Sequence, residues 1–265
     1  MTGICFKMLM YHSVSVSDRK MRVISFAWQH MLLIVSLFVM TLGVALCVRS
    51  ALGCSVISTI PYVMTLAGGS SMAPALTIGE YTYLMNAVLV LFQIALLRRR
   101  FEWVQLFQLV IGFFFGFLLD VNMAITAALD YGTLWRQIAA QLAGCTILAL
   151  GIAMEIRCGS VTMPGEGITV AVSRVTGLPF PKAKIYVDTT LVALAVTAGY
   201  CFFGHWLWNV VGFATLFAMV YVGMAVKAIN PHMRWFDRLL HYRPGFRRYV
   251  YGLARFIAAY RAPRH

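Results

Sequence analysis

Six apolar runs, each close to the length of a membrane-spanning helix, constrain this chain more than any other feature. They occupy about residues 25–48, 78–97, 103–129, 134–156, 184–203 and 206–229. None contains a proline, and every proline before the basic C-terminal tail lies in one of two connecting segments, 49–77 and 158–183. Proline breaks helix interiors, and about 20 apolar residues cross a bilayer. The pattern therefore predicts an all-α membrane protein with six transmembrane helices.

Composition and charge agree with a membrane protein. Only 12% of residues are charged, against about 25% in soluble domains. The net charge of +13 would suggest nucleic acid as a partner of a soluble protein. Here, with the N-terminus inside, all Lys and Arg residues except Arg49 and Arg136 fall on the inner side. We expect a bacterial inner (plasma) membrane protein with both termini cytoplasmic, in contact with anionic lipid and not with nucleic acid.

An internal repeat divides the chain into two halves. Leu42–Ser50 resembles Leu150–Cys158, with Leu, Gly, Ala and Arg identical, although Leu/Ala/Gly-rich segments also match by chance. Each match ends a helix, leads into a proline-containing segment, and is followed by two more helices. Three spans is an odd number, so the halves would cross the membrane in opposite senses. We expect inverted three-helix repeats at 25–130 and 131–230, after a poorly ordered segment 1–24 (starting at Met1 or Met21) and before a basic tail, 231–265.

The two broken segments are the expected functional region. Non-helical backbone inside hydrocarbon must be buried in protein or line a cavity. We expect two re-entrant half-helices, at about 54–66 and 165–175, meeting near the midplane as in transporters with inverted repeats. Alternatively, both segments lie flat on the membrane surfaces. Pro164, Gly165 and Gly167 form the turn of the second segment.

Acidic residues within the apolar runs are the candidate contacts for a solute or an ion. A charge at the bilayer centre costs about 2.5–3.5 kcal/mol. Asp120, with Asn122 nearby, has no local partner and fits a cavity wall. Asp188 follows Lys184 by four residues, so an ion pair and a functional contact are both open. Glu166 is either a first-turn acid of a half-helix or a contact for a ligand, cation or proton.

Other charged residues fit structural or topological roles. Glu155 and Arg157 end the fourth helix, where snorkelling to the surface is expected. Arg49 ends the first helix in the same way. The run Arg98, Arg99 and Arg100 closes the second helix and marks the inner side.

The remaining patterns predict structure more than chemistry. Gly112 and Gly116 form a small-xxx-small face for close helix packing. The six cysteines form no CxxC pair and the histidines have no metal-ligand spacing, so we expect free thiols, no metal and no cofactor. After Pro244-Gly245, apolar residues at spacings of three and four predict an amphipathic helix over about 246–260 on the anionic inner leaflet.

Four stretches resemble the YczE/YitT-like family of bacterial multi-pass membrane proteins, closest to its YczE-type branch. They are TIGEYTYLMNAVLVLFQIALLRRRFE (77–102), GFLLDVNM (116–123), MPGEGITVAVS (163–173) and PKAKIYVDTTLV (181–192). The resemblance implies the same six-helix architecture and places Asn86, with Asp120, Glu166, Lys184, Asp188 and the arginine run, at recurrent polar positions. The family's Gly-x-x-Glu-Gly-Thr turn is replaced here by Asn209–Thr215, which has no acid.

Two classes of function fit the sequence. The first is a secondary transporter or exporter of a small solute, favoured by the inverted repeat and the intramembrane acids. The second is a membrane accessory protein that supports a biosynthetic or secretion complex, with purely structural acids. No nucleophile–base pattern indicates an enzyme. Besides lipid, the expected partners are an unidentified small solute and a second copy of the chain.

Overall fold

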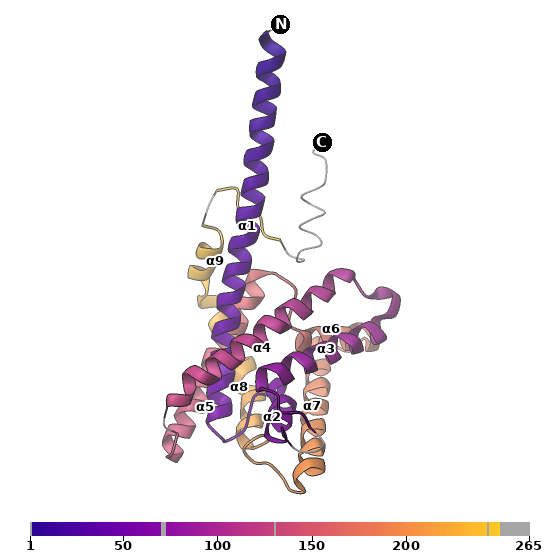
Figure 1. Cartoon of the computed structure of the whole chain (residues 1–265), viewed down its shortest axis with the longest axis vertical. Helices are drawn as coiled ribbons and strands as arrows, with labels where there is room; N and C mark the ends of the chain where they lie inside the picture. Colours follow the sequence, from indigo (N-terminus) through magenta and orange to yellow (C-terminus); the bar gives the residue numbers. More distant parts are fainter. Residues whose placement is uncertain (1, 70–72, 130, 243, 250–265) are drawn as a thin grey trace.

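The computed structural model describes residues 2–69, 73–129, 131–242 and 244–249, and within these residues it is entirely helical with connecting turns (Figure 1). The α-helices are α1 Thr2–Arg49, α2 Val56–Leu66, α3 Ile78–Leu97, α4 Phe107–Ile125, α5 Leu134–Cys158, α6 Pro164–Thr176, α7 Phe180–Phe203, α8 Phe213–Ile229 and α9 Arg234–Leu240. Short 3-10 turns lie at Arg98–Arg100, Trp103–Leu106, Thr126–Ala128 and Asn230–His232.

Six of these segments are long and apolar enough to cross a membrane, as a multi-pass membrane protein requires. They are Arg19–Arg49, Ile78–Arg100, Trp103–Ala128, Leu134–Cys158, Lys182–Phe203 and Phe213–His232. The predicted fold class is therefore confirmed. One boundary was wrong: the last span begins at Phe213 rather than at residue 206. Gly204 ends α7 with a φ of 70°, and an irregular turn follows it.

The N-terminal segment forms the start of α1, since residues 2–18 are helical. This part of α1 projects beyond the rest of the molecule (Figure 1). The side chains of this projection are not described.

Helices α1 and α5 cross at the centre of the molecule through the two glycines of the internal repeat. A Cβ on Gly43 would strike the backbone of Leu148, and a Cβ on Gly151 would strike the backbone of Met40. A shift of 108 residues maps Gly43 onto Gly151 and Met40 onto Leu148. The contact is therefore made twice, with the roles of the two helices exchanged. Since Ser36 approaches Cys158 while Ser50 bonds Gln141, the helices run antiparallel, as an inverted repeat requires.

The other helices pair according to the same exchange. α1 packs on α4 as α5 packs on α8, α2 packs on α7 as α3 packs on α6, and α2 packs on α3 as α6 packs on α7. The ends of the corresponding helices α1 and α5 also make similar contacts. Arg49 Nη2 donates to the carbonyl of Met123 at the end of α4 (2.8 Å), and Arg157 Nη2 donates to the side-chain oxygen of Asn230 after α8 (2.9 Å). Chance similarity does not account for this agreement in three dimensions.

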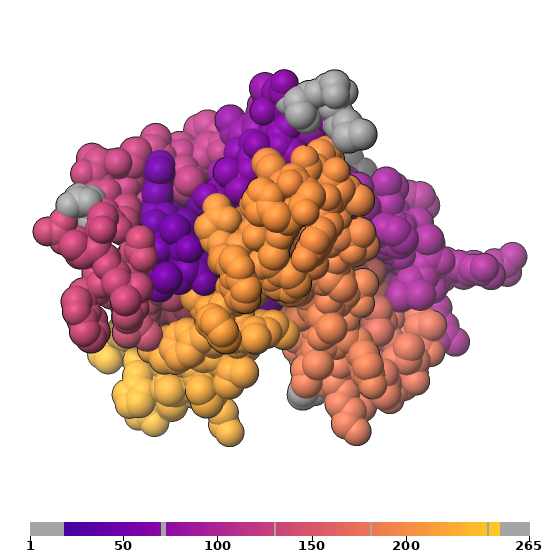
Figure 2. Space-filling model, turned by 90° about the horizontal axis from the view of Figure 1, so that it is seen from below, coloured from indigo at the N-terminus to yellow at the C-terminus, as the bar shows by residue number. Residues whose placement is uncertain are grey.

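One pair of helices breaks the symmetry. α3 and α4 are packed tightly, with Gly79 against Gly116 and Gly112 against Asn86, which confirms the predicted small-residue packing face. The corresponding helices, α7 and α8, make almost no contact with each other. Seen from below, the molecule is hollowed between the salmon segment that contains α7 and the yellow-orange segment that contains α8 (Figure 2).

The described part of the C-terminal region packs against the bundle. Phe236 and Leu240 of α9 are fully buried in the main core. Further on, Gln29 Nε2 donates to the carbonyl of Tyr249 (2.7 Å), and the Tyr249 amide donates back to Gln29 Oε1 (2.9 Å). Residues 246–249 are not helical. The rest of the predicted amphipathic helix lies outside the described residues.

Candidate functional site

The two short helices begin side by side at the centre of the molecule. A Cβ on Gly165, the second residue of α6, would strike the side chain of Ile57, the second residue of α2. Val56 and Ile60 of α2 share an apolar cluster with Ile168 of α6. Both helices pack between long helices, and the first turns of α6 are largely buried, whereas its last residues, Arg174–Thr176, are exposed. This arrangement favours the re-entrant alternative, and the observed limits match the predicted ones to within two residues.

Close packing at this junction depends on the residues of the predicted turn. Pro164 is the first residue of α6, where its missing N–H leaves no helical hydrogen bond unmade. A Cβ on Gly167 would lie 2.7 Å from Gln93 Oε1. Gln93 Nε2 in turn donates to the side chain of Gln108 (3.0 Å) and to the carbonyl of Pro164 (3.1 Å). These contacts fix the start of α6 against α3.

A cavity of about 350 Å³ lies beside this junction, where α7 and α8 separate. Its wall comes from both halves of the chain and is mostly apolar. The lining residues are Met40, Val44, Ser55, Val56, Ile57, Phe115, Leu148, Ile152, Ile156, Met163, Glu166, Phe180, Lys184, Asp188, Ala218, Met219, Val222, Gly223 and Val226. This volume is at the lower end of the range for small-molecule sites.

Three of the predicted site residues supply all the charge on this wall. Lys184 Nζ lies 2.9 Å from Asp188 Oδ1, so the ion pair that the spacing suggested is present. Asp188 is only 8% exposed. Both residues act electrostatically on the Glu166 carboxylate, which sits on the first turn of α6. Lys184 and Asp188 therefore form an ion pair and also line a cavity, so the two alternatives left open by the sequence are compatible.

Glu155 is a further acid near this cluster, and its sequence-based interpretation was wrong. Instead of snorkelling to the surface, it is buried at 4% exposure. Its Oε1 accepts a hydrogen bond from the Met163 amide (3.2 Å), just before α6. It acts electrostatically on Glu166. The turn of the chain between α5 and α6 folds back over Glu155, and residue spacing alone did not reveal this.

Asp120 lies elsewhere and does not line the cavity. Its two carboxylate oxygens accept hydrogen bonds from Thr77 Oγ1 (2.6 Å) and from the Gly79 amide (2.8 Å) at the start of α3. Its partners are 43 and 41 residues away along the chain, so no local pattern pointed to them. Asp120 therefore caps α3 and ties it to α4.

The two predicted asparagines also lie outside the cavity wall. Asn122 Nδ2 donates to Thr41 Oγ1 (2.8 Å) and to the Phe38 carbonyl (3.1 Å), which joins α4 to α1. Asn86 is 1% exposed and packs against Gly112. Within the described residues, neither polar atom of the Asn86 amide has a hydrogen-bond partner.

The predicted structural arginines have distinct positions. Arg157 forms an ion pair with Asp237 in addition to its bonds to Asn230. Arg98, Arg99 and Arg100 form an exposed turn at the end of α3.

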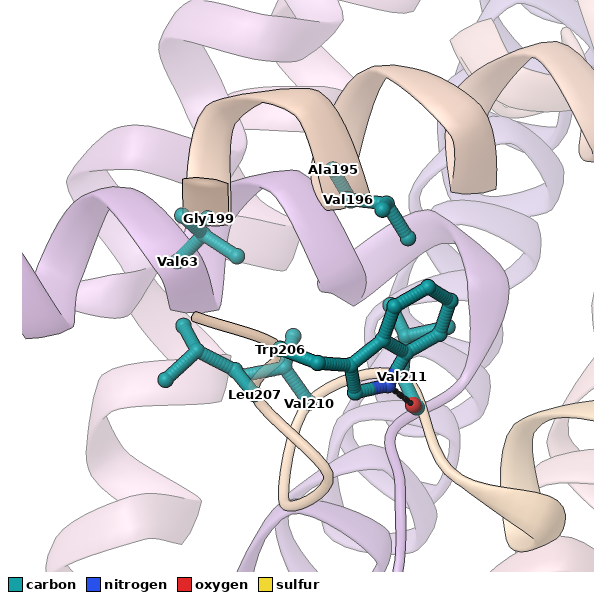
Figure 3. A pocket seen from close by; sticks show the side chains of 8 residues that line it. All are labelled: Val63, Ala195, Val196, Gly199, Trp206, Leu207, Val210 and Val211. Carbon is teal, nitrogen blue, oxygen red and sulfur yellow. Dashed lines mark hydrogen bonds between the residues drawn. The ribbon is translucent and has the colours of Figure 1, made fainter. Parts of the chain in front are cut away.

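A second pocket is too small to hold a solute. It lies between α2, α7 and the turn before α8, where Trp206 Nε1 donates to the Val211 carbonyl (2.8 Å) (Figure 3). Its volume is about 10 Å³, which is close to the space that one water molecule needs. Among the described residues, no group of three or more His, Cys, Asp or Glu side chains could hold a metal ion.

Comparison with known proteins gives a family without an assigned activity. The family described as "Family of unknown function (DUF6198)" matches residues 27–231, which is most of the chain and includes every cavity-lining residue. No curated protein and no solved structure matches the chain.

Proposed function

This chain belongs to the DUF6198 family of unknown function, and we propose that it is a secondary transporter or exporter of a small solute in the bacterial inner membrane. The four stretches that resemble the YczE/YitT-like proteins agree with this architecture, and that narrower family assignment is part of the proposal. The N- and C-termini are cytoplasmic, as the Lys and Arg distribution favours. The solute binds in the cavity beside the starts of α2 and α6.

The observation that carries the proposal is the one departure from the inverted symmetry. The pair α3 and α4 in the first half corresponds to the pair α7 and α8 in the second half. One pair, α3 and α4, is closed, while the other, α7 and α8, is open onto the cavity. Exchanging the conformations of the halves would close the second pair and open the first. Such an exchange presents one central site alternately to the two sides of a membrane.

The position of the half-helices supports this mechanism. Arg49 and Arg157 each lie six residues beyond a glycine of the central crossing, or about 9 Å along a helix. Half the hydrocarbon thickness is about 15 Å. If the crossing marks the midplane, α2 and α6 begin inside the apolar layer. Their backbone there is buried in protein and beside a cavity, as hydrocarbon demands.

The alternative is a membrane accessory protein without transport. In that case the cavity would be a packing defect without a function. The three charged residues of the cavity wall, Glu166, Lys184 and Asp188, lie close together in space, and this argues against a mere defect. An enzymatic role has no support from a nucleophile–base arrangement, so we propose that the protein is not an enzyme. A homodimer belongs to the proposal only as an expectation.

The direct test compares metabolites inside and outside cells that contain or lack the protein. A solute that changes its distribution is then followed in vesicles containing the purified protein. We expect uptake or efflux with the wild-type protein and none with Glu166→Gln, while Glu102→Gln, an exposed acid, keeps the activity. Equal metabolite distributions in both cell lines, under conditions where the protein is produced, would favour the accessory role.

A further inference from the structure

The cavity wall carries two acidic side chains and one basic side chain. This excess of negative charge favours one class of ligand. Lys184 and Asp188 form one ion pair at 2.9 Å, which leaves no net charge. Glu166 is the remaining charged residue of the wall. Within the described residues, no side chain or backbone group forms a hydrogen bond or an ion pair with its carboxylate.

Two opposing influences act on the charge of Glu166. It lies in the first turn of α6, where the positive end of the helix dipole stabilises a carboxylate. Burial beside the mostly apolar cavity wall opposes this charge, because a buried charge without a partner is unfavourable. A positively charged ligand would remove this imbalance.

Anionic and neutral ligands fit the wall less well. An anion would have to replace Asp188 at Lys184 while facing Glu166 and, behind it, Glu155. A neutral apolar molecule would displace water and leave Glu166 unpaired. By contrast, the apolar remainder of the wall, including Phe115 and Phe180, suits the body of an organic cation, since aromatic faces also attract cations.

We propose that the cavity binds an organic monocation with an apolar body, whose ammonium group pairs with Glu166. The proposal rests on the function proposed above, because it names the solute class of the same site. The pair Lys184–Asp188 is neutral overall, so Glu166 gives the cavity wall a net charge of −1, which matches a single positive charge on the ligand. The cavity volume of about 350 Å³ limits the ligand to a small molecule.

The test measures binding to the purified full-length protein in lipid nanodiscs by titration calorimetry. The probes are benzyltrimethylammonium and benzenesulfonate, which share an aromatic ring and differ in the sign of their charge. We expect saturable binding of the cation and none of the anion. Glu166→Gln should weaken cation binding by about tenfold or more, as the loss of a buried charge partner does.

Two further variants identify the group that binds. Glu102→Gln makes the same chemical change at an exposed position outside the cavity, and it should leave the affinity unchanged. Lys184→Gln should not weaken cation binding, because it removes a positive charge from the wall. Binding of benzenesulfonate by the wild-type protein, or loss of cation binding in Lys184→Gln alone, would overturn the proposal even if Glu166→Gln fails to fold.

The binding and transport measurements test the ligand class and the transport function separately. Cation binding without movement of the cation across vesicles would contradict the transport function and leave the site assigned. Transport of another solute that depends on Glu166, without any cation binding, would contradict the ligand class and leave the transport function in place.

Discussion

At the scale of single residues, the chain uses the same residue types for two different purposes. Asp120 and Glu166 are both acids within apolar sequence, but Asp120 accepts two hydrogen bonds from α3, while Glu166 faces the cavity. The glycines also differ. Gly43 and Gly151 lie where backbones cross, whereas a Cβ on Gly223 would meet no atom within 4 Å. The role of each residue is decided by what lies opposite it.

The central crossing gives a prediction for single glycines. Gly43→Ala and Gly151→Ala should each destabilise the protein by about 1–3 kcal/mol, because the added methyl group meets backbone atoms that cannot move aside. The symmetry of the contact predicts similar losses for the two. Thermal unfolding of the purified protein in nanodiscs measures both, and Gly223→Ala serves as the control. A glycine whose replacement leaves the unfolding temperature unchanged would contradict the close crossing.

At the scale of elements, short helices depend on long-range polar contacts for their positions. The start of α6 is fixed by Gln93 through the Pro164 carbonyl, and the segment before it by Glu155 through the Met163 amide. The start of α3 is likewise fixed by Asp120 from α4. Thr77 and Glu80 add a capping box at the same place.

The cap on α3 gives a second prediction. Asp120→Ala should lower the stability by about 1 kcal/mol, because two donors at the start of α3 lose their acceptor. Asp120→Asn keeps one acceptor oxygen and should lower it less. Both variants should still bind benzyltrimethylammonium, since Asp120 is not on the cavity wall. The unfolding temperature tests the predicted loss of stability, and calorimetry tests the predicted cation binding. Loss of binding in a folded Asp120→Asn protein would indicate that Asp120 contributes to the binding site.

At the scale of the whole molecule, the inverted repeat and its single asymmetry are the main features. The halves share their helix order, their crossing glycines and their helix-end arginines. The main difference in helix packing is that α3 and α4 are in close contact, whereas α7 and α8 are separated. In the proposed transport cycle, a second conformation would exchange these relations, with α7–α8 closed and α3–α4 open.

Locking the closed pair gives a prediction at this scale that needs no known substrate. Tyr83 and Phe113 face each other across α3 and α4, with ring centres 5.7 Å apart. A disulfide in Tyr83→Cys/Phe113→Cys should hold this pair closed. A third cysteine, Val222→Cys on the cavity wall, then reports access to membrane-impermeant thiol reagents, in a protein whose exposed Cys201 and N-terminal Cys5 are replaced by Ser.

We expect Val222→Cys to be labelled from both sides of the membrane without the disulfide, and from one side only with it. The same protein after reduction is the control. Labelling from both sides in the oxidised protein would contradict an exchange of conformations between the halves.

The sequence by itself determined the class of the protein and its repeat. Six apolar runs without proline, two segments that contain the prolines, and one repeated Leu-Gly…Arg pattern are local features, and they define helices because apolar length and backbone breaking act locally. The spacing of Lys184 and Asp188 also offered an ion pair as one of two alternatives, since four residues make about one helical turn. The limits of α2 and α6 followed from proline and glycine for the same reason.

Only the tertiary structure decided which polar residues face the cavity. Asp120 finds its partners on another helix, Glu155 is covered by the turn before α6, and the gap between α7 and α8 is absent between α3 and α4. Each of these depends on contacts between residues far apart in the chain, and spacing along one helix contains no information about them. The sequence supplied the half-helices and their acids, and the packing of the two halves left Glu166 as the one wall charge without a partner among the described residues.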